Sequence, residues 1–62
     1  MNVILKISIL EKKGSQSALA REIEVCESLI SKIVQGRRQP TPEQRQAISK
    51  ALGAPEHELF PN

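Results

Sequence analysis

The sequence predicts an all-α fold of five short helices, and three observations carry that prediction. Residues 27–35 divide into one apolar and one polar arc when they are placed at the α-helical step of about 100°. Residues 41–44 (TPEQ) form a helix start, with Thr as N-cap, Pro at the first helical position and Gln able to complete a capping box. Glycines at positions 14, 36 and 53 each follow a helix-like segment, where glycine commonly ends a helix.

Length and composition limit the classes of protein that fit. Sixty-two residues with 39% hydrophobic content predict one small domain spanning residues 1–62. A net charge of +2 does not by itself identify a nucleic-acid partner, and a single aromatic residue argues against a base-stacking single-strand binder. One Cys and one His cannot complete a tetrahedral zinc site, so we expect no metal and no cofactor. The apolar run near the N-terminus is too short for a bilayer and lacks signal-peptide features, which favours a soluble cytoplasmic protein.

Residues 2–13 admit two interpretations. Apolar residues occupy alternate positions, as in a strand, but Val3, Ile7 and Leu10 also share one face of a helix. Two lysines followed by Gly14 are typical of a helix C-terminus, which favours the helix and leaves the strand as the alternative. In such a helix we expect Val3, Ile7 and Leu10 to meet the core, with Ile4 at their edge.

A second helix begins after Ser15, whose hydroxyl is a suitable N-cap. Leu19, Ala20 and Ile23 form its narrow apolar stripe, and the methyl group of Ala20 allows another helix to cross closely. A turn over residues 24–26 follows, from which Val25 should point inward.

The third predicted helix, residues 27–35, has two chemically opposed faces. Its apolar arc consists of Leu29, Ile30, Ile33 and Val34, and its polar arc of Glu27, Ser28, Ser31, Lys32 and Gln35. The polar arc combines several kinds of hydrogen-bonding group, and a surface of this kind can read the edges of bases.

These segments together resemble a known family. Residues 15–36 and the loop after them are similar to the helix-turn-helix unit of Cro and related phage repressors, also called the xenobiotic-response-element-like family. The matching pieces are Ser15-Gln16, Leu19-Ala20, Val25, Ile30-Ser31 and the GRRQP of residues 36–40. The similarity continues through residues 48–60 (ISKALGAPEHELF), so that it covers nearly the whole chain. The resemblance implies a compact five-helix fold of repressor type, with its first helix within residues 2–13.

Three positions depart from the family pattern. Glu24 stands where the family often has Gly, because the backbone there tends towards positive φ, and this predicts either strain or a different turn. Cys26 replaces the usual Ser or Thr N-cap, although Glu27 favours the positive end of the helix dipole. The linker from the first helix into the second is one residue shorter than the family pattern, because Gly14 leads directly into Ser15.

The resemblance also implies roles for exposed residues. The expected base contacts come from Glu27, Ser28, Ser31 and Lys32. The expected phosphate contacts come from Gln16, Arg37 and Arg38, with Arg21 and Arg45 of lower rank. The competing interpretation is that these side chains form an ordinary solvated surface, as polar residues usually do.

The function that the resemblance implies is sequence-specific binding of double-stranded DNA by a phage- or prophage-type repressor that occludes its operator. One alternative is an antitoxin that regulates its own promoter and binds a toxin. The other is a protein-interaction module without DNA binding, which Glu24, Glu27 and the modest charge leave open. We expect no enzyme, because His57 lies between two glutamates with no nucleophile nearby in sequence.

Regulators of this type bind pseudo-palindromic sites as homodimers. Residues 42–52 should form a fourth helix that buries Ala47, Ile48, Ala51 and Leu52, and PEHELF a fifth, short helix. Two apolar patches are then candidates for a dimer interface. They are Leu5 with Ile9, on the side of the first helix that we expect to be exposed, and Leu59 with Phe60 at the chain end.

Overall fold

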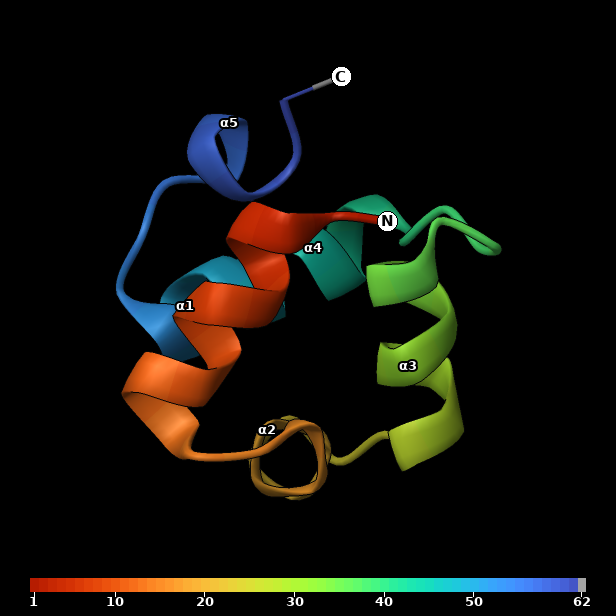
Figure 1. Cartoon of the computed structure of the whole chain (residues 1–62), viewed down its shortest axis with the longest axis vertical. Helices are drawn as coiled ribbons and strands as arrows, with labels where there is room; N and C mark the ends of the chain where they lie inside the picture. The colour runs from red at the N-terminus through yellow and green to blue at the C-terminus, as the bar shows by residue number, and fades with distance from the viewer. Residues whose placement is uncertain (62) are drawn as a thin grey trace.

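Five helices make up the regular structure of residues 1–61, which the computed structural model describes (Figure 1). They are α1 (Val3–Lys13), α2 (Gln16–Glu22), α3 (Glu27–Gln35), α4 (Pro42–Leu52) and α5 (Glu56–Leu59). No strand occurs among these residues, which confirms the all-α prediction and settles the N-terminal segment as a helix.

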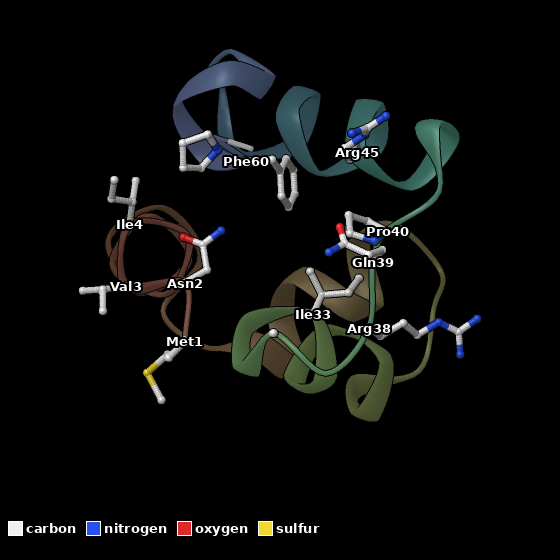
Figure 2. Close-up of a pocket in the computed structure, with 12 residues that line it drawn as sticks. Met1, Asn2, Val3, Ile4, Ile33, Arg38, Gln39, Pro40, Arg45 and Phe60 are labelled. Atoms are coloured by element: carbon white, nitrogen blue, oxygen red, sulfur yellow. The ribbon is translucent and has the colours of Figure 1, made fainter.

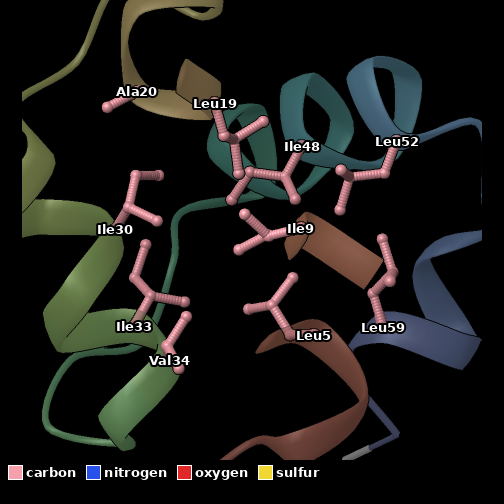
Figure 3. Close-up of a cluster of buried hydrophobic side chains, with 10 residues drawn as sticks. All are labelled: Leu5, Ile9, Leu19, Ala20, Ile30, Ile33, Val34, Ile48, Leu52 and Leu59. Atoms are coloured by element: carbon pink, nitrogen blue, oxygen red, sulfur yellow. The ribbon is translucent and has the colours of Figure 1, made fainter. Parts of the chain in front are cut away.

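The core is built from aliphatic side chains that all five helices supply (Figure 3). Ten residues are almost completely buried, and they are Leu5, Ile9, Leu19, Ala20, Ile30, Ile33, Val34, Ile48, Leu52 and Leu59. Helix α1 lies at the centre of this arrangement, because it contacts each of the other four helices. Each buried Leu, Ile or Val contributes about 1.5–3 kcal/mol, so α1 depends on the side chains that it turns inward.

The inward face of α1 is the opposite of the one predicted. Leu5 and Ile9 are 0% exposed, whereas Val3, Ile4, Ile7 and Leu10 are each about half exposed. The prediction that Leu5 and Ile9 could form a dimer interface is therefore wrong, because both side chains are enclosed within their own chain. Both faces of α1 are apolar, so helical periodicity alone could not decide which of them meets the core.

Asn2 fixes the start of α1 and was missed in the sequence analysis. Its side-chain Oδ1 accepts the backbone N–H of Leu5 at 3.0 Å, as an N-cap does. Its own backbone N–H donates to the Val34 carbonyl at 2.7 Å, and its Nδ2 donates to the Leu59 carbonyl at 2.6 Å. One residue therefore joins the beginning of α1 to the end of α3 and to α5. The signal for the cap, an Asn directly before an apolar helical run, was present in the sequence.

A single left-handed residue explains the short linker between α1 and α2. Gly14 has φ +86°, and its N–H bonds to the carbonyls of Ile9 and Leu10. Ser15 then caps α2 through a hydrogen bond from the Ala18 N–H to its Oγ at 3.1 Å, as predicted. Glycine tolerates positive φ without steric cost, so one residue reverses the chain here.

Helix α4 starts and ends where the sequence predicts. Thr41 and Gln44 form the capping box, with distances of 3.1 Å to Thr41 Oγ1 and 2.9 Å to Gln44 Oε1. The predicted burial of Ile48 and Leu52 is confirmed, but Ala47 and Ala51 are only partly buried.

The chain end closes the core from the side of α5. Leu59 is 0% exposed and Phe60 is partly buried against the core, so both side chains cover this end of it. Because Leu59 has no exposed surface, the prediction that it belongs to a dimer interface is wrong.

We expect replacement of Asn2 by Ala to lower the free energy of unfolding by about 1–3 kcal/mol, through loss of the cap and of the bond to Leu59. Asn2→Asp keeps the capping acceptor but lacks the donor, so its loss should be smaller. Urea unfolding followed by circular dichroism measures both variants. An alanine variant as stable as the wild type would contradict a structural role for Asn2.

Candidate nucleic-acid interface

Helix α3 presents its polar arc to solvent and buries its apolar arc, as predicted. Ile30, Ile33 and Val34 are at most 4% exposed, and Leu29 packs against them from a partly buried position. The outward residues Glu27, Ser28, Lys32 and Gln35 are exposed, and Ser31 is partly exposed. The four side chains predicted to contact bases therefore lie on one rigidly supported helix.

Gln35 belongs to the same surface but was not among the predicted contacts. Its Nε2 donates to Ser31 Oγ at 3.3 Å, so the two side chains form a connected pair one turn apart. The sequence signal was the i, i+4 spacing of two residues that can hydrogen-bond to one another. The pair offers both a donor and an acceptor to a ligand that lies along α3.

The turn between α2 and α3 is a Schellman motif with an unusual residue in its left-handed position. The Val25 N–H bonds to the Ala20 carbonyl at 2.9 Å, and the Glu24 N–H bonds to the Arg21 carbonyl at 3.3 Å. Glu24 has φ +60°, a conformation that is rare for residues with a side chain. Of the two outcomes expected for Glu24, strain in a regular turn is therefore the one found. Val25 packs against the core, as predicted.

The charges along α3 are unevenly distributed. Glu24 and Glu27 are exposed at its N-terminal end, whereas Lys32 is exposed near its C-terminal end. Cys26 occupies the N-cap position, but its exposed side chain makes no capping hydrogen bond. The basic half of α3 is therefore the better partner for phosphate or for guanine, and the acidic half repels phosphates.

A cationic loop continues the basic half of α3. Gly36 has φ +80°, and the Arg37 N–H bonds to the Lys32 carbonyl at 2.9 Å, which fixes the start of the loop. Arg37 and Arg38 are both exposed, and the loop leaves α3 at the end far from α2 (Figure 1). The ion pairs found among residues 1–61 are Lys13–Glu22 and Arg45–Glu56, so neither loop arginine is neutralised within that part of the chain.

The other predicted phosphate contacts lie on α2 and α4. Gln16 is the first residue of α2 and is partly exposed, and Arg21 is exposed in its last turn. Arg45 is partly buried, with its Nε 3.8 Å from Glu56 Oε1, so its charge is already offset in part. Its lower rank as a phosphate contact fits this pairing.

A shallow groove lies behind the loop, between the start of α1, the end of α3 and the chain end (Figure 2). It encloses about 480 Å³, and Asn2, Ile33, Pro40 and Phe60 are among the residues that line it. Figure 2 shows Arg38 on the opposite side of this groove from Val3 and Ile4. Gly36, Arg38 and Gln39 also line the groove, so it adjoins the cationic loop that follows α3.

An all-helical fold whose α2 and α3 join through a tight turn, with a polar face of α3 exposed, defines the helix-turn-helix class. The helix-turn-helix family model of Cro and repressor type matches residues 5–59, and the chain belongs to this family. At the level of the family, the protein is a transcription regulator that binds double-stranded DNA. No curated protein and no solved structure matches the chain.

The described residues contain neither a membrane-spanning helix nor a cluster of metal-binding side chains. None of the helices within residues 1–61 is long and apolar enough to cross a membrane. The same residues contain no cluster of three or more His, Cys, Asp or Glu side chains that could hold a metal ion.

Replacing Glu24 by Gly should raise the free energy of unfolding by about 1 kcal/mol, because glycine adopts the left-handed conformation without strain. For a chain of this size, that gain corresponds to a rise in Tm of about 4–8 °C. Thermal unfolding followed by circular dichroism gives the comparison.

Glu43→Gly is the matched control, because it removes the same side chain from the exposed first turn of α4. This variant should lose stability, since glycine is a poor helix former. Equal losses in the two variants would show that the turn at Glu24 stores no strain.

Proposed function

We propose that the protein is a repressor of phage or prophage type, which blocks transcription by occupying an operator through α3. The observation that carries this proposal is the exposed polar arc of α3, held outward by an apolar arc that is almost completely buried. An α-helix fits the major groove of B-form DNA, where each base pair presents a distinct pattern of donors and acceptors.

Within this proposal, Lys32 donates to guanine O6 or N7, and Ser28 and Ser31 donate to or accept from neighbouring base edges. Glu27 either accepts from a cytosine N4 or favours the positive end of the α3 dipole. The hydrogen bond between Gln35 and Ser31 favours a fixed orientation of the serine hydroxyl in the groove.

Phosphate contacts would flank the reading surface on both sides. Gln16 and Arg21 belong to α2, next to the start of α3, whereas Arg37 and Arg38 follow its end (Figure 1). Three to five phosphate contacts would give a log–log salt slope of about −3 to −5 for each subunit. As a homodimer, the protein would read two half-sites of a pseudo-palindrome about one helical turn apart.

Two alternative functions, an antitoxin and a protein-interaction module, would use other parts of the surface. The exposed apolar side chains of α1 and the acidic start of α3 are suited to a protein partner, such as the toxin of an antitoxin pair. An antitoxin would retain DNA binding, whereas a pure protein-interaction module would not. The basic residues at the end of α3 form no ion pair within residues 1–61, which favours the DNA-binding functions.

Lys32→Ala should weaken binding to the preferred duplex by about 1–3 kcal/mol and relax the preference at one base pair. The preferred duplex is first selected from a random pool, and affinities are then measured by fluorescence anisotropy at several salt concentrations. Lys50→Ala, at an exposed position of α4, is the matched control and should leave the base preference unchanged.

Arg38→Ala provides the contrast, because it should weaken binding to all duplexes alike and reduce the salt slope by about one. If Lys32→Ala and Arg38→Ala both lower affinity without changing the base preference, α3 contacts the backbone and does not read bases. If neither variant changes affinity, the proposed interface is wrong.

A further inference from the structure

Helix α1 carries an apolar stripe that the fold of a single chain leaves uncovered. Val3, Ile7 and Leu10 are 55%, 49% and 50% exposed, and Ile4 beside them is 53% exposed. Their spacing of four and then three residues places them on one face, opposite the buried pair Leu5 and Ile9. Figure 2 shows Val3 and Ile4 pointing away from the rest of the molecule.

Apolar residues with this spacing are typical of the seam along which two helices of a coiled coil pack. In heptad terms Val3 and Leu10 take position d and Ile7 takes position a, so that Lys6 is a g residue and Glu11 the next e residue. Lys6 and Glu11 therefore flank the seam on its two sides. Both are exposed, and neither forms an ion pair with any of residues 1–61.

The charges of Lys6 and Glu11 determine which helix fits against this face of α1 and whether it runs parallel or antiparallel. In a parallel pair of helices, a g residue of one chain meets the e residue five positions later in the other chain. Lys6 of one copy would then meet Glu11 of a second copy, and two-fold symmetry would form the same pair again. In an antiparallel pair, g residues face each other, so the two Lys6 side chains would be brought together. Charge complementarity therefore favours a second copy in the parallel arrangement.

We propose that the exposed face of α1 is the homodimer interface, formed by parallel packing of α1 against α1 of a second copy. This inference deepens the proposed function, and it relies on that function only for the effect of DNA on the dimer. Helix α1 is only about 16 Å long, so the interface is smaller than the typical 800 Å² or so for each partner. A weak dimer in free solution that tightens on an operator follows from that size.

The proposed interface lies away from the cationic loop. Val3 and Ile4 point to the side away from Arg38, so contact through α1 leaves the cationic loop uncovered (Figure 2).

The direct test is sedimentation equilibrium of the full chain without DNA, for the wild type and variants of α1. We expect the wild type to show a monomer–dimer equilibrium and Ile7→Lys to be monomeric. Lys6→Glu and Glu11→Lys should each weaken the dimer about tenfold, because each variant replaces two attractive pairs with repulsive ones. The double variant Lys6→Glu/Glu11→Lys should restore the wild-type dissociation constant. Lys50→Glu makes the same charge change on α4 and should have no effect.

A second measurement keeps failure of the interface distinct from failure of DNA binding. Ile7→Lys should bind a duplex with a single half-site as the wild type does, but should lose cooperative binding to the palindrome. If Ile7→Lys fails to fold, the charge-exchange series decides the question, because those positions are exposed.

Three results would overturn the inference. They are a wild type that stays monomeric with and without the palindrome, a Lys6→Glu variant that associates like the wild type, and a double variant weaker than both single variants. The last result would show that the helices do not pack in parallel.

Discussion

The burial of Leu5 and Ile9 is the contact on which the rest of the structure depends. These two side chains give α1 its place at the centre of the fold, where it contacts every other helix. Asn2 supports the same arrangement from the start of α1, through bonds to α3 and α5 that join distant parts of the chain. In a core of ten aliphatic residues, each large side chain is a substantial fraction of the total stabilisation. The orientation of α1 therefore determines both what the core contains and what the surface exposes.

The orientation of α3 depends on a second close contact, at Ala20. This residue is 3% exposed, and its carbonyl accepts the N–H of Val25 from the turn. A small side chain lets α2 and α3 approach closely, and the Schellman motif sets the direction in which the chain leaves α2. Glu24 holds a left-handed conformation in that turn, so the packing around it outweighs the local backbone preference. The base-reading function proposed for α3 relies on this rigid support, because small displacements of a reading helix break base contacts.

Local chemistry made most of the helices predictable from the sequence. The Thr41–Gln44 capping box, the Ser15 cap and the division of α3 into two faces all depend on residues close together in the chain. The inward face of α1 could not be predicted in this way, because both of its faces are apolar and only contacts with other helices distinguish them. The bonds of Asn2 to Val34 and Leu59 are likewise tertiary, although its role as a cap was readable from the sequence.

In the candidate site, too, the sequence predicts what local periodicity determines and not what contacts between helices determine. The polar arc of α3 follows from helical periodicity, so its residues could be named before the structure was known. The pairing of Arg45 with Glu56 joins α4 to α5, and no spacing rule in the sequence predicts it. The exposed stripe of α1 is a consequence of the burial of Leu5 and Ile9, and it became visible only once that burial was established.

In the proposed complex, α3 and the loop after it contact DNA. Nuclear magnetic resonance of the isotope-labelled protein, titrated with a duplex that carries one selected half-site, tests this contact most directly. We expect the largest shift changes at Ser28, Ser31, Lys32 and Arg38, while Ile7 and Leu10 on the exposed face of α1 change little. Shift changes confined to α1, or none in α3 at saturating DNA, would contradict this expectation.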